Sequence, residues 1–242
     1  MGFVAIIAIA SVVAGAIAAV AGFGIGSILT PLMALRVDTK TAVAAVSVPH
    51  LIGTALRFWR LRRYVDRDVL WSFGVTSAAG GLIGALLHNF ADSPVLSAIL
   101  GALLVFAGVS GLTGFSAKVR FGRKTAYIAG AVSGALGGLV GNQGGIRSAA
   151  MLGFHVPKES FVATATAIAL MVDAARMPVY FANHRTDLAG LWAVVVVASA
   201  GVAAGTLGGD KILRRLPEPL FRRLVSLLIL SLGLFVLLRL GG

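Results

Sequence analysis

The sequence predicts an all-helical protein that crosses a membrane several times and consists of two related halves of opposite orientation. Three observations carry this prediction. Apolar runs of roughly 16 to 20 residues recur from one end of the chain to the other. Charged residues are few and gather in short loops between these runs. A shift of 119 residues places the second half of the chain over the first.

The composition is that of a membrane protein. The 242 residues are 58% hydrophobic and 12% charged, and the mean hydropathy is +0.94. A soluble domain carries about twice this charged fraction. No polar stretch is long enough to fold as a soluble domain, so we expect one compact, multi-pass unit in the lipid bilayer of the cell inner (plasma) membrane.

The net charge of +12 does not indicate nucleic-acid binding, because of where the basic residues lie. Fourteen of the 21 Lys and Arg fall in three short loops: Arg57, Arg60, Arg62, Arg63 and Arg67; Lys118, Arg120, Arg123 and Lys124; and Lys211, Arg214, Arg215, Arg222 and Arg223. Basic loops between apolar spans mark the cytoplasmic face and are attracted to anionic lipid. The chain has no cysteine, which excludes disulfides and thiolate metal sites.

An internal repeat accounts for scarce residues that match at one fixed shift. The shift pairs Gly15 with Gly134, Gly22 with Gly141, Gly26 with Gly145, Arg57 with Arg176 and Asp68 with Asp187. Glycine matches are frequent by chance in this composition, whereas Arg and Asp matches are not. Transporter folds often contain such repeats. We expect a first repeat over 1–113, a basic cytoplasmic linker over 114–125 and a second repeat over 126–242.

The loop charges predict that the two repeats are inverted. In the first half the loop after the 41–56 span is basic, and the loop from His88 to Pro94 has no Lys or Arg. In the second half the order is exchanged, because the loop at 182–187 has only Arg185 while the loop at 210–223 is strongly basic. Equivalent loops therefore lie on opposite sides of the membrane.

The first element of each half is expected to be a broken, re-entrant hairpin. The basic loops at 114–125 and 210–223 are both predicted to be cytoplasmic. Between them lie three apolar segments, 126–153, 160–181 and 188–208. Three simple crossings would place the two loops on opposite sides, so one segment must enter the membrane and return to the same side. Segment 126–153 would be about 42 Å long as one helix, too long for an ordinary span. It contains the Gly-rich break 137–145, and its repeat partner, about 3–35, contains the break 22–26 followed by Pro31.

Three plain helices are then expected in each half, with both chain termini outside. Non-helical backbone at membrane depth is tolerated only where protein or a wet cavity surrounds it. Paired breaks at equivalent positions point to a transport site. The alternative is that the glycines only let helices pack closely, as most of the 31 glycines surely do.

The residues Gly22-Phe23-Gly24-Ile25-Gly26 with Pro31-Leu32, and the repeated Gly141-Asn142-Gln143-Gly144-Gly145, resemble the Gly-rich signature of the TauE/SafE family. The duplicated layout, the size and the basic central loop match as well, so the resemblance covers the whole chain. The family is associated with export of small sulfur-containing anions such as sulfite and organosulfonates. The resemblance implies a secondary transporter for such anions, without a cofactor. Asn142-Gln143 and the following Arg147 depart from the usual pattern.

Substrate binding is predicted at the two breaks. A helix that begins just after Gly26 or Gly145 would present unpaired N–H groups and a partial positive charge to an anion. Glycine permits close approach of backbone to ligand. The candidate residues are Gly24, Gly26 and Ser27 in the first break and Asn142, Gln143, Gly144 and Gly145 in the second. Asn142 and Gln143 could instead form a polar link between helices.

Arg147 is the sharpest single candidate, because an Arg inside an apolar run is costly unless it faces a cavity or a partner. Its guanidinium could bind a sulfonate or sulfite through two N–H groups. The alternatives are an Arg that extends to the membrane surface or pairs with an acid such as Asp173.

The repeat mates Arg57 and Arg176 are predicted to gather anions at opposite mouths of the pathway. Asp173 lies three residues before Arg176, so a local ion pair is the plainest interpretation. His50 or Asp173 could also couple transport to a proton, and sodium is the other candidate coupling ion.

An anion channel, or a carrier of another small organic anion, remains the alternative to a sulfur-anion exporter. Saturable, exchangeable flux distinguishes a carrier from a channel. No paired carboxylates or His–metal cluster indicates an enzyme or a metal site. The sequence leaves open whether the protein forms a homodimer.

Overall fold

The computed structural model describes residues 2–114, 123–142, 144, 147, 151, 154, 156–209 and 217–240. All secondary-structure elements in these residues are helical, which confirms the all-α membrane fold. In chain order they are α1 (Gly2–Ala21), α2 (Ile25–Met33), α3 (Thr39–Leu61), η1 (Arg62–Tyr64), α4 (Arg67–Val69), η2 (Leu70–Gly74), α5 (Val75–Phe90), α6 (Ser93–Thr113), α8 (Arg123–Val140), α10 (Lys158–Asn183), α11 (Arg185–Gly190), α12 (Trp192–Ala204), η4 (Gly205–Gly209) and α14 (Glu218–Leu238).

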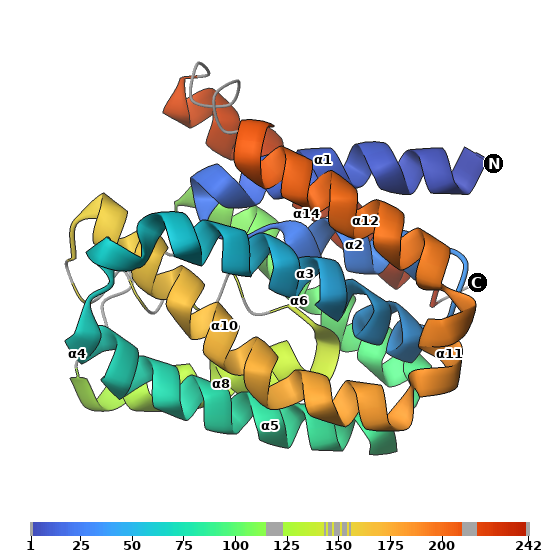
Figure 1. The fold of residues 1–242 in the computed structure, drawn as a ribbon, viewed down its shortest axis with the longest axis horizontal. Coiled ribbons are helices and arrows are strands. Elements are labelled where there is room, and N and C mark those ends of the chain that lie inside the picture. The colour runs from blue at the N-terminus through green and yellow to red at the C-terminus, as the bar shows by residue number, and fades with distance from the viewer. Residues whose placement is uncertain are drawn as a thin grey trace.

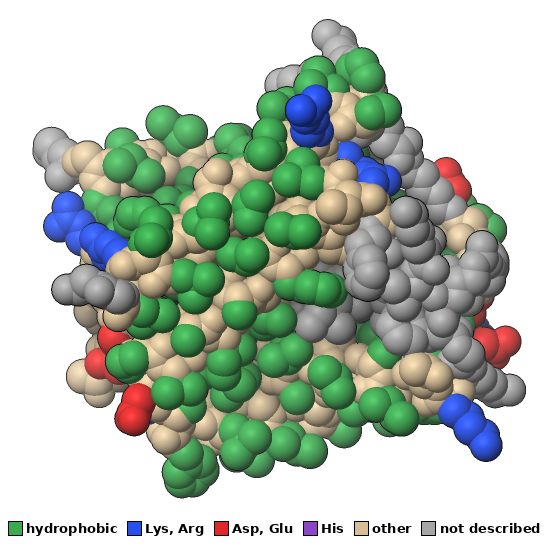
Figure 2. Space-filling view, turned by 180° about the vertical axis from the view of Figure 1, so that it is seen from behind, with side chains coloured by type: hydrophobic (Ala, Val, Ile, Leu, Met, Phe, Trp, Pro, Cys, Tyr) green, Lys and Arg blue, Asp and Glu red, His purple; other side chains and the backbone are tan. Residues whose placement is uncertain are grey.

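Six helical segments of the described chain are long and apolar enough to cross a membrane. They are Gly2–Ala21, Thr39–Tyr64, Arg67–Phe90, Ser93–Thr113, Glu159–Asn183 and Pro219–Leu238, and Trp192–Gly208 is a shorter apolar helix. Large apolar side chains on them are exposed, for example Ile9 at 69% and Trp71 at 66%. Figure 2 shows apolar side chains across the middle of one face, with charged side chains toward its margins. This surface suits hydrocarbon rather than water, so the protein is a multi-pass membrane protein.

The helices run roughly along one common direction, so the bundle has two ends (Figure 1). The N-terminus, the C-terminus and α11 lie at one end, and α4 lies at the other. The α6–α14 pair lies at the periphery, because these two segments are the least buried of the candidate spans.

The first hairpin consists of two arms of unequal length. Helix α1 runs without interruption for 20 residues, long enough to cross a membrane alone, because glycine and proline do not break its apolar run before Gly22. Gly22 and Gly24 have φ angles of 81° and 131°, which favour glycine, and they redirect the chain into the nine-residue α2. Eight of the nine α2 residues are buried, so this short arm lies inside the protein.

Helix α3 begins at a well-formed cap. The Asp38 carboxylate accepts hydrogen bonds from the backbone N–H groups of Lys40 (2.9 Å) and Thr41 (3.2 Å). Partial burial acts to raise the pKa of Asp38, but hydrogen bonds from Thr41, Ser93 and Lys40 outweigh it and hold this pKa below its ordinary value. The cap fixes where the first hairpin ends and the first plain helix starts.

The structural landmarks of the two halves lie 119 residues apart, as the sequence shift predicts. Helices α1 and α8 end at Ala21 and Val140, and helices α3 and α10 begin at Thr39 and Lys158. Gly141, with a φ of 71°, ends α8 as Gly22 ends α1. Helix α1 packs on α12 and η4 while α8 packs on α5, and α3 packs on α10. These matches support an internal repeat, while its inverted orientation and the linker, of which 115–122 lie outside the described residues, stay predictions.

Many glycines outside the breaks serve helix packing. At Gly80, Gly84, Gly134 and Gly138, a backbone carbonyl of the facing helix occupies the place where a Cβ would be, which brings α5 and α8 into backbone contact. Gly15 and Gly205 do the same between α1 and the α12–η4 segment. Small residues allow such close approach within a membrane, where dispersion forces rather than the hydrophobic effect hold helices together.

Candidate functional site

The two Gly-rich breaks meet inside the protein. A Cβ at Gly26 would lie 2.5 Å from the carbonyl oxygen of Gly141, and a Cβ at Gly144 would lie 2.5 Å from the Cβ of Phe23. The Ser27 hydroxyl donates a hydrogen bond of 3.1 Å to Asn142 Oδ1. Segments 115 residues apart in sequence are therefore in direct contact, and glycine is needed at the crossing because backbone occupies the side-chain space.

Arg57 and Arg176 hold the ends of the broken helices in the same way. Arg57 Nη1 donates to the carbonyl of Ala18 in α1 (2.7 Å), and Arg176 Nη1 donates to the carbonyl of Gly137 in α8 (2.6 Å). Ala18 and Gly137 are themselves 119 residues apart. Each carbonyl also accepts the backbone N–H of the break glycine, Gly22 or Gly141. The C-terminal end of a helix carries partial negative charge, so a cation there is favourable. The two Arg thus occupy equivalent structural positions.

The second contact of each Arg differs. Arg57 Nε donates to the hydroxyl of Thr166 (2.8 Å), whereas Arg176 Nε donates to the Asp173 carboxylate (3.0 Å). Both guanidinium groups are buried, with exposed fractions of 3% and 2%. In this conformation neither lies at an open mouth, so their predicted role in gathering anions stays a prediction.

Asp173 joins two helices. Its Oδ2 lies 2.7 Å from His50 Nδ1 on α3, and its Oδ1 lies 2.8 Å from Arg176 Nη2 on its own helix α10. The expected ion pair with Arg176 is present, and the link to His50 was not expected from the sequence. Asp173 is fully buried and is the only acid among the buried residues that the structure describes.

Arg147 differs from the other two arginines in having free donors. It is helical, follows the second break and is 2% exposed, so it does not extend to the membrane surface. It is close enough to Arg57, Asp173 and Arg176 to interact with their charges. Within the described chain, its Nε and Nη1 atoms have no hydrogen-bond partner. A buried guanidinium with unpaired N–H groups is strongly unfavourable unless an acceptor arrives.

The interior therefore has an imbalance of charge. Among the described residues, Arg57, Arg147 and Arg176 face one buried carboxylate, that of Asp173, so the positive charges outnumber the negative charge by two when His50 is neutral. Two further buried hydroxyl groups near these residues, those of Thr30 and Thr54, have no partner among the described residues. Together these groups can supply donors and positive charge to a small anion.

The structure brings together most of the residues predicted for the site. Gly26, Ser27, Asn142 and Gly144 lie at the crossing of the breaks, while Gly24 begins α2 beside Ile17. His50, Arg57, Arg147, Asp173 and Arg176 form the charged cluster. Gln143 and Gly145 lie outside the described residues.

Sequence reasoning missed several members of the site. Thr166 holds Arg57, and the buried Tyr180 donates its hydroxyl hydrogen to the Gly138 carbonyl. The spacing of polar residues along α10 could have predicted Tyr180 as a member of the site. Successive intervals of three or four residues separate Asp173, Arg176, Tyr180 and the C-cap residue His184, so these four residues form a stripe along one face of the helix. The same spacing could have predicted Thr54, which lies one helical turn from both His50 and Arg57 on α3.

This stripe continues to a pair of histidines near α11. The rings of His88 and His184 lie 5.6 Å apart and His88 lies 5.1 Å from Tyr180. The Nδ1 of His88 is 2.7 Å from the Leu139 carbonyl, to which it must donate. The interior cluster is therefore connected by polar side chains to the end of the bundle that carries both termini (Figure 1).

Asp173→Asn tests whether the single buried carboxylate stabilises the cluster. The change leaves three buried guanidinium groups without a counter-charge, and breaking a buried ion pair costs about 3–5 kcal/mol in the free energy of unfolding. We expect a clearly lower melting temperature of the purified protein in detergent. Asp187→Asn is the control, because Asp187 is 52% exposed and pairs weakly with His184. Equal melting temperatures for the two variants would contradict this account of the cluster.

Comparison with known proteins gives a clear family result. The family model described as "Sulfite exporter TauE/SafE" matches residues 7–236, nearly the whole chain. No curated protein and no solved structure matches. The family resemblance inferred from the Gly-rich breaks is thereby confirmed. The chain belongs to the TauE/SafE sulfite exporter family of membrane transporters.

Proposed function

We propose that the protein is a secondary transporter that moves sulfite or small organosulfonates across the membrane by alternating access, with Arg147 as the central anion-binding residue. The observation that carries the proposal is the unpaired, buried guanidinium of Arg147 in a cluster with surplus positive charge. Family membership supports anion transport, and the site supports a small, strongly accepting anion.

The charge imbalance supports an anion as the missing partner. Transferring an isolated charge from water into a protein interior costs many kcal/mol, so surplus buried cations persist only with compensation. Arg57 and Arg176 already donate to carbonyl, hydroxyl and carboxylate oxygens. Arg147 has donors left over, and an anion bound to it would supply both the acceptor and the negative charge.

The donor set fits sulfite and sulfonates. These anions carry several oxygens on one sulfur, which can accept from more than one N–H of a guanidinium at once. The hydroxyls of Thr30 and Thr54 are additional donors of the kind that can bind an oxyanion. The carbon-bound part of a sulfonate would need an apolar wall, which the surrounding core of Ile25, Ile28 and Val46 offers.

The contact between the breaks supports alternating access. Each break belongs to one proposed repeat, and Ser27 and Asn142 link them at the crossing. Movement of one repeat against the other would expose the anion first to one side and then to the other, as in other carriers with inverted repeats. The helix ends held by Arg57 and Arg176 would move with their own arginines, because each Arg binds a helix of its own repeat.

Proton coupling is the role we propose for the His50–Asp173 pair. The pair lies beside Arg176 and within electrostatic range of Arg147. A proton on this pair would add positive charge to the cluster and so favour an anion. Release of the proton and the anion to the same side would leave an empty site, which could then turn back to the other side of the membrane.

Flux of radiolabelled sulfite and of a small sulfonate in proteoliposomes tests the function. We expect saturable flux in the wild type that trans-side substrate accelerates. Arg147→Met removes the charge while keeping a similar volume, so flux should fall at least about tenfold because charge-assisted hydrogen bonds are lost. The control is Arg185→Met, which changes the same residue type at an exposed position.

The melting temperature of Arg147→Met separates binding from structure. Because Arg147 adds to a surplus of charge, removing it should leave the anion-free protein as stable as the wild type or more stable. Loss of folding in Arg147→Met would assign Arg147 a structural role. Non-saturable flux would indicate a channel, and flux of neither anion would contradict the proposed substrates.

Side-specific labelling tests the inverted topology. Because the chain has no cysteine, single cysteines can be placed without removing others. We expect Arg63→Cys to react with a membrane-impermeant maleimide only from the cytoplasmic side. Ala91→Cys and Asn183→Cys should react only from outside. Labelling of Arg63→Cys and Asn183→Cys from the same side would rule out inverted halves.

A further inference from the structure

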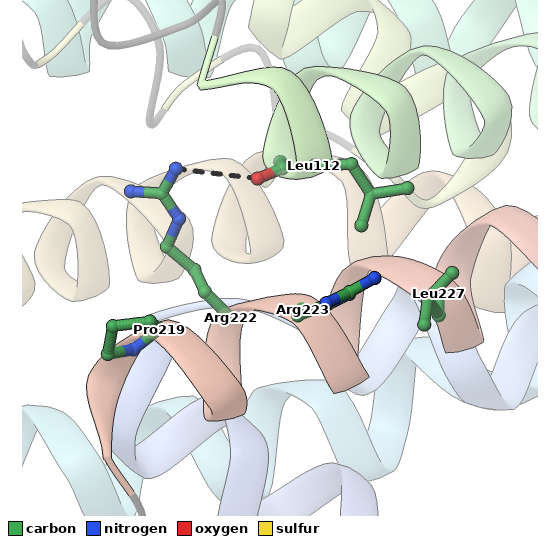
Figure 3. Close-up of a pocket in the computed structure, with 6 residues that line it drawn as sticks. Leu112, Pro219, Arg222, Arg223 and Leu227 are labelled. Carbon is green, nitrogen blue, oxygen red and sulfur yellow. Dashed lines mark hydrogen bonds between the residues drawn. The ribbon is translucent and has the colours of Figure 1, made fainter.

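A groove at the α4 end of the bundle lies apart from the arginine cluster. It has a volume of about 780 Å³ and lies between the last turn of α6 and the first turns of α14. Figure 3 shows Leu112 on the α6 side and Pro219, Arg222, Arg223 and Leu227 along α14. Gly111 also lines the groove. None of these residues belongs to the proposed transport site.

The groove combines a basic end with an apolar wall. Arg222 extends from α14 toward α6, where its Nη2 donates to the Gly111 carbonyl over 3.4 Å (Figure 3). Arg223 makes no ion pair with any described acid, and none of the six lining residues is acidic. Leu112 and Leu227 are 38% and 43% exposed, and they present apolar side chains beside the two guanidinium groups.

The position of the groove determines what can fill it. Helices α6 and α14 are the least buried candidate spans, so their outer faces contact lipid. The first turn of α14 belongs to the 210–223 loop region, whose basic residues mark the cytoplasmic interface. At this depth the surrounding molecules have an anionic headgroup at the level of the arginines and acyl chains at the level of the leucines.

We propose that this groove binds one anionic phospholipid, with its phosphate on Arg222 and Arg223 and an acyl chain along Leu112 and Leu227. Arg222 uses one N–H on Gly111, which positions the guanidinium across the groove and leaves its other donors for phosphate oxygens. The bound lipid would join α6 to α14 at the α4 end of the bundle. The proposal is independent of which anion the protein transports.

Lipid binding to purified protein provides the test. Phosphatidylglycerol and phosphatidylcholine are titrated separately into detergent-solubilised protein, and bound lipid is counted by native mass spectrometry. We expect one phosphatidylglycerol to be retained with an affinity at least about tenfold higher than that of phosphatidylcholine, because each Arg near an anionic headgroup adds binding. The double variant R222Q/R223Q should lose this preference.

The matched control is R185Q/R239Q, which removes two exposed arginines at the opposite end of the bundle (Figure 1). It should retain the preference for phosphatidylglycerol. Retention of the preference by R222Q/R223Q would overturn the proposal. Displacement of phosphatidylglycerol by inorganic phosphate at millimolar concentration would assign the groove to a free anion, and a lipid-free dimer would assign it to a second copy of the chain.

Discussion

The structure depends on one unfavourable quantity, the surplus of positive charge buried in its interior. In the part of the chain that the structure describes, three buried arginines lie with one buried carboxylate inside a protein that hydrocarbon surrounds. Two of the arginines donate to carbonyls in the last turn of the broken helices, where the helix dipole places partial negative charge. The breaks and the arginines are therefore linked, because each Arg adds a charged donor to a carbonyl that also accepts the N–H of the break glycine, Gly22 or Gly141.

The third arginine gives the arrangement its asymmetry. The position in the first half that corresponds to Arg147 is Ile28, a buried apolar residue. The two halves are thus alike in how they end and hold their broken helices, and unlike in what they present at the crossing. One unpaired charge near the meeting point of the two halves is what the proposed carrier of a single anion requires.

Most of the fold could be predicted from the sequence, because the features that determine it are local or periodic. Apolar length, loop charge and glycine clusters predicted the spans, the breaks and the family, and the repeat shift predicted that Gly22 and Gly141 would occupy equivalent helix ends. The length of α1 was not anticipated, because the break lies at the end of a full apolar span rather than at its middle. The residues of the cluster were predicted one by one, and of their contacts only the local ion pair between Asp173 and Arg176 was predicted. Whether Asp173 binds His50, or whether Arg57 binds the Ala18 carbonyl, depends on how helices pack, and neither hydropathy nor spacing encodes that distance.

The most direct measurement of the central claim is the position of the anion itself. Selenite is a close heavy analogue of sulfite, and its selenium can be located by anomalous scattering in crystals soaked with it. The account predicts a peak within about 4 Å of the Arg147 guanidinium, close to the crossing of the two breaks, as expected for hydrogen-bonded oxygens around the heavy atom. A peak confined to the surface arginines, with none in the interior, would contradict it.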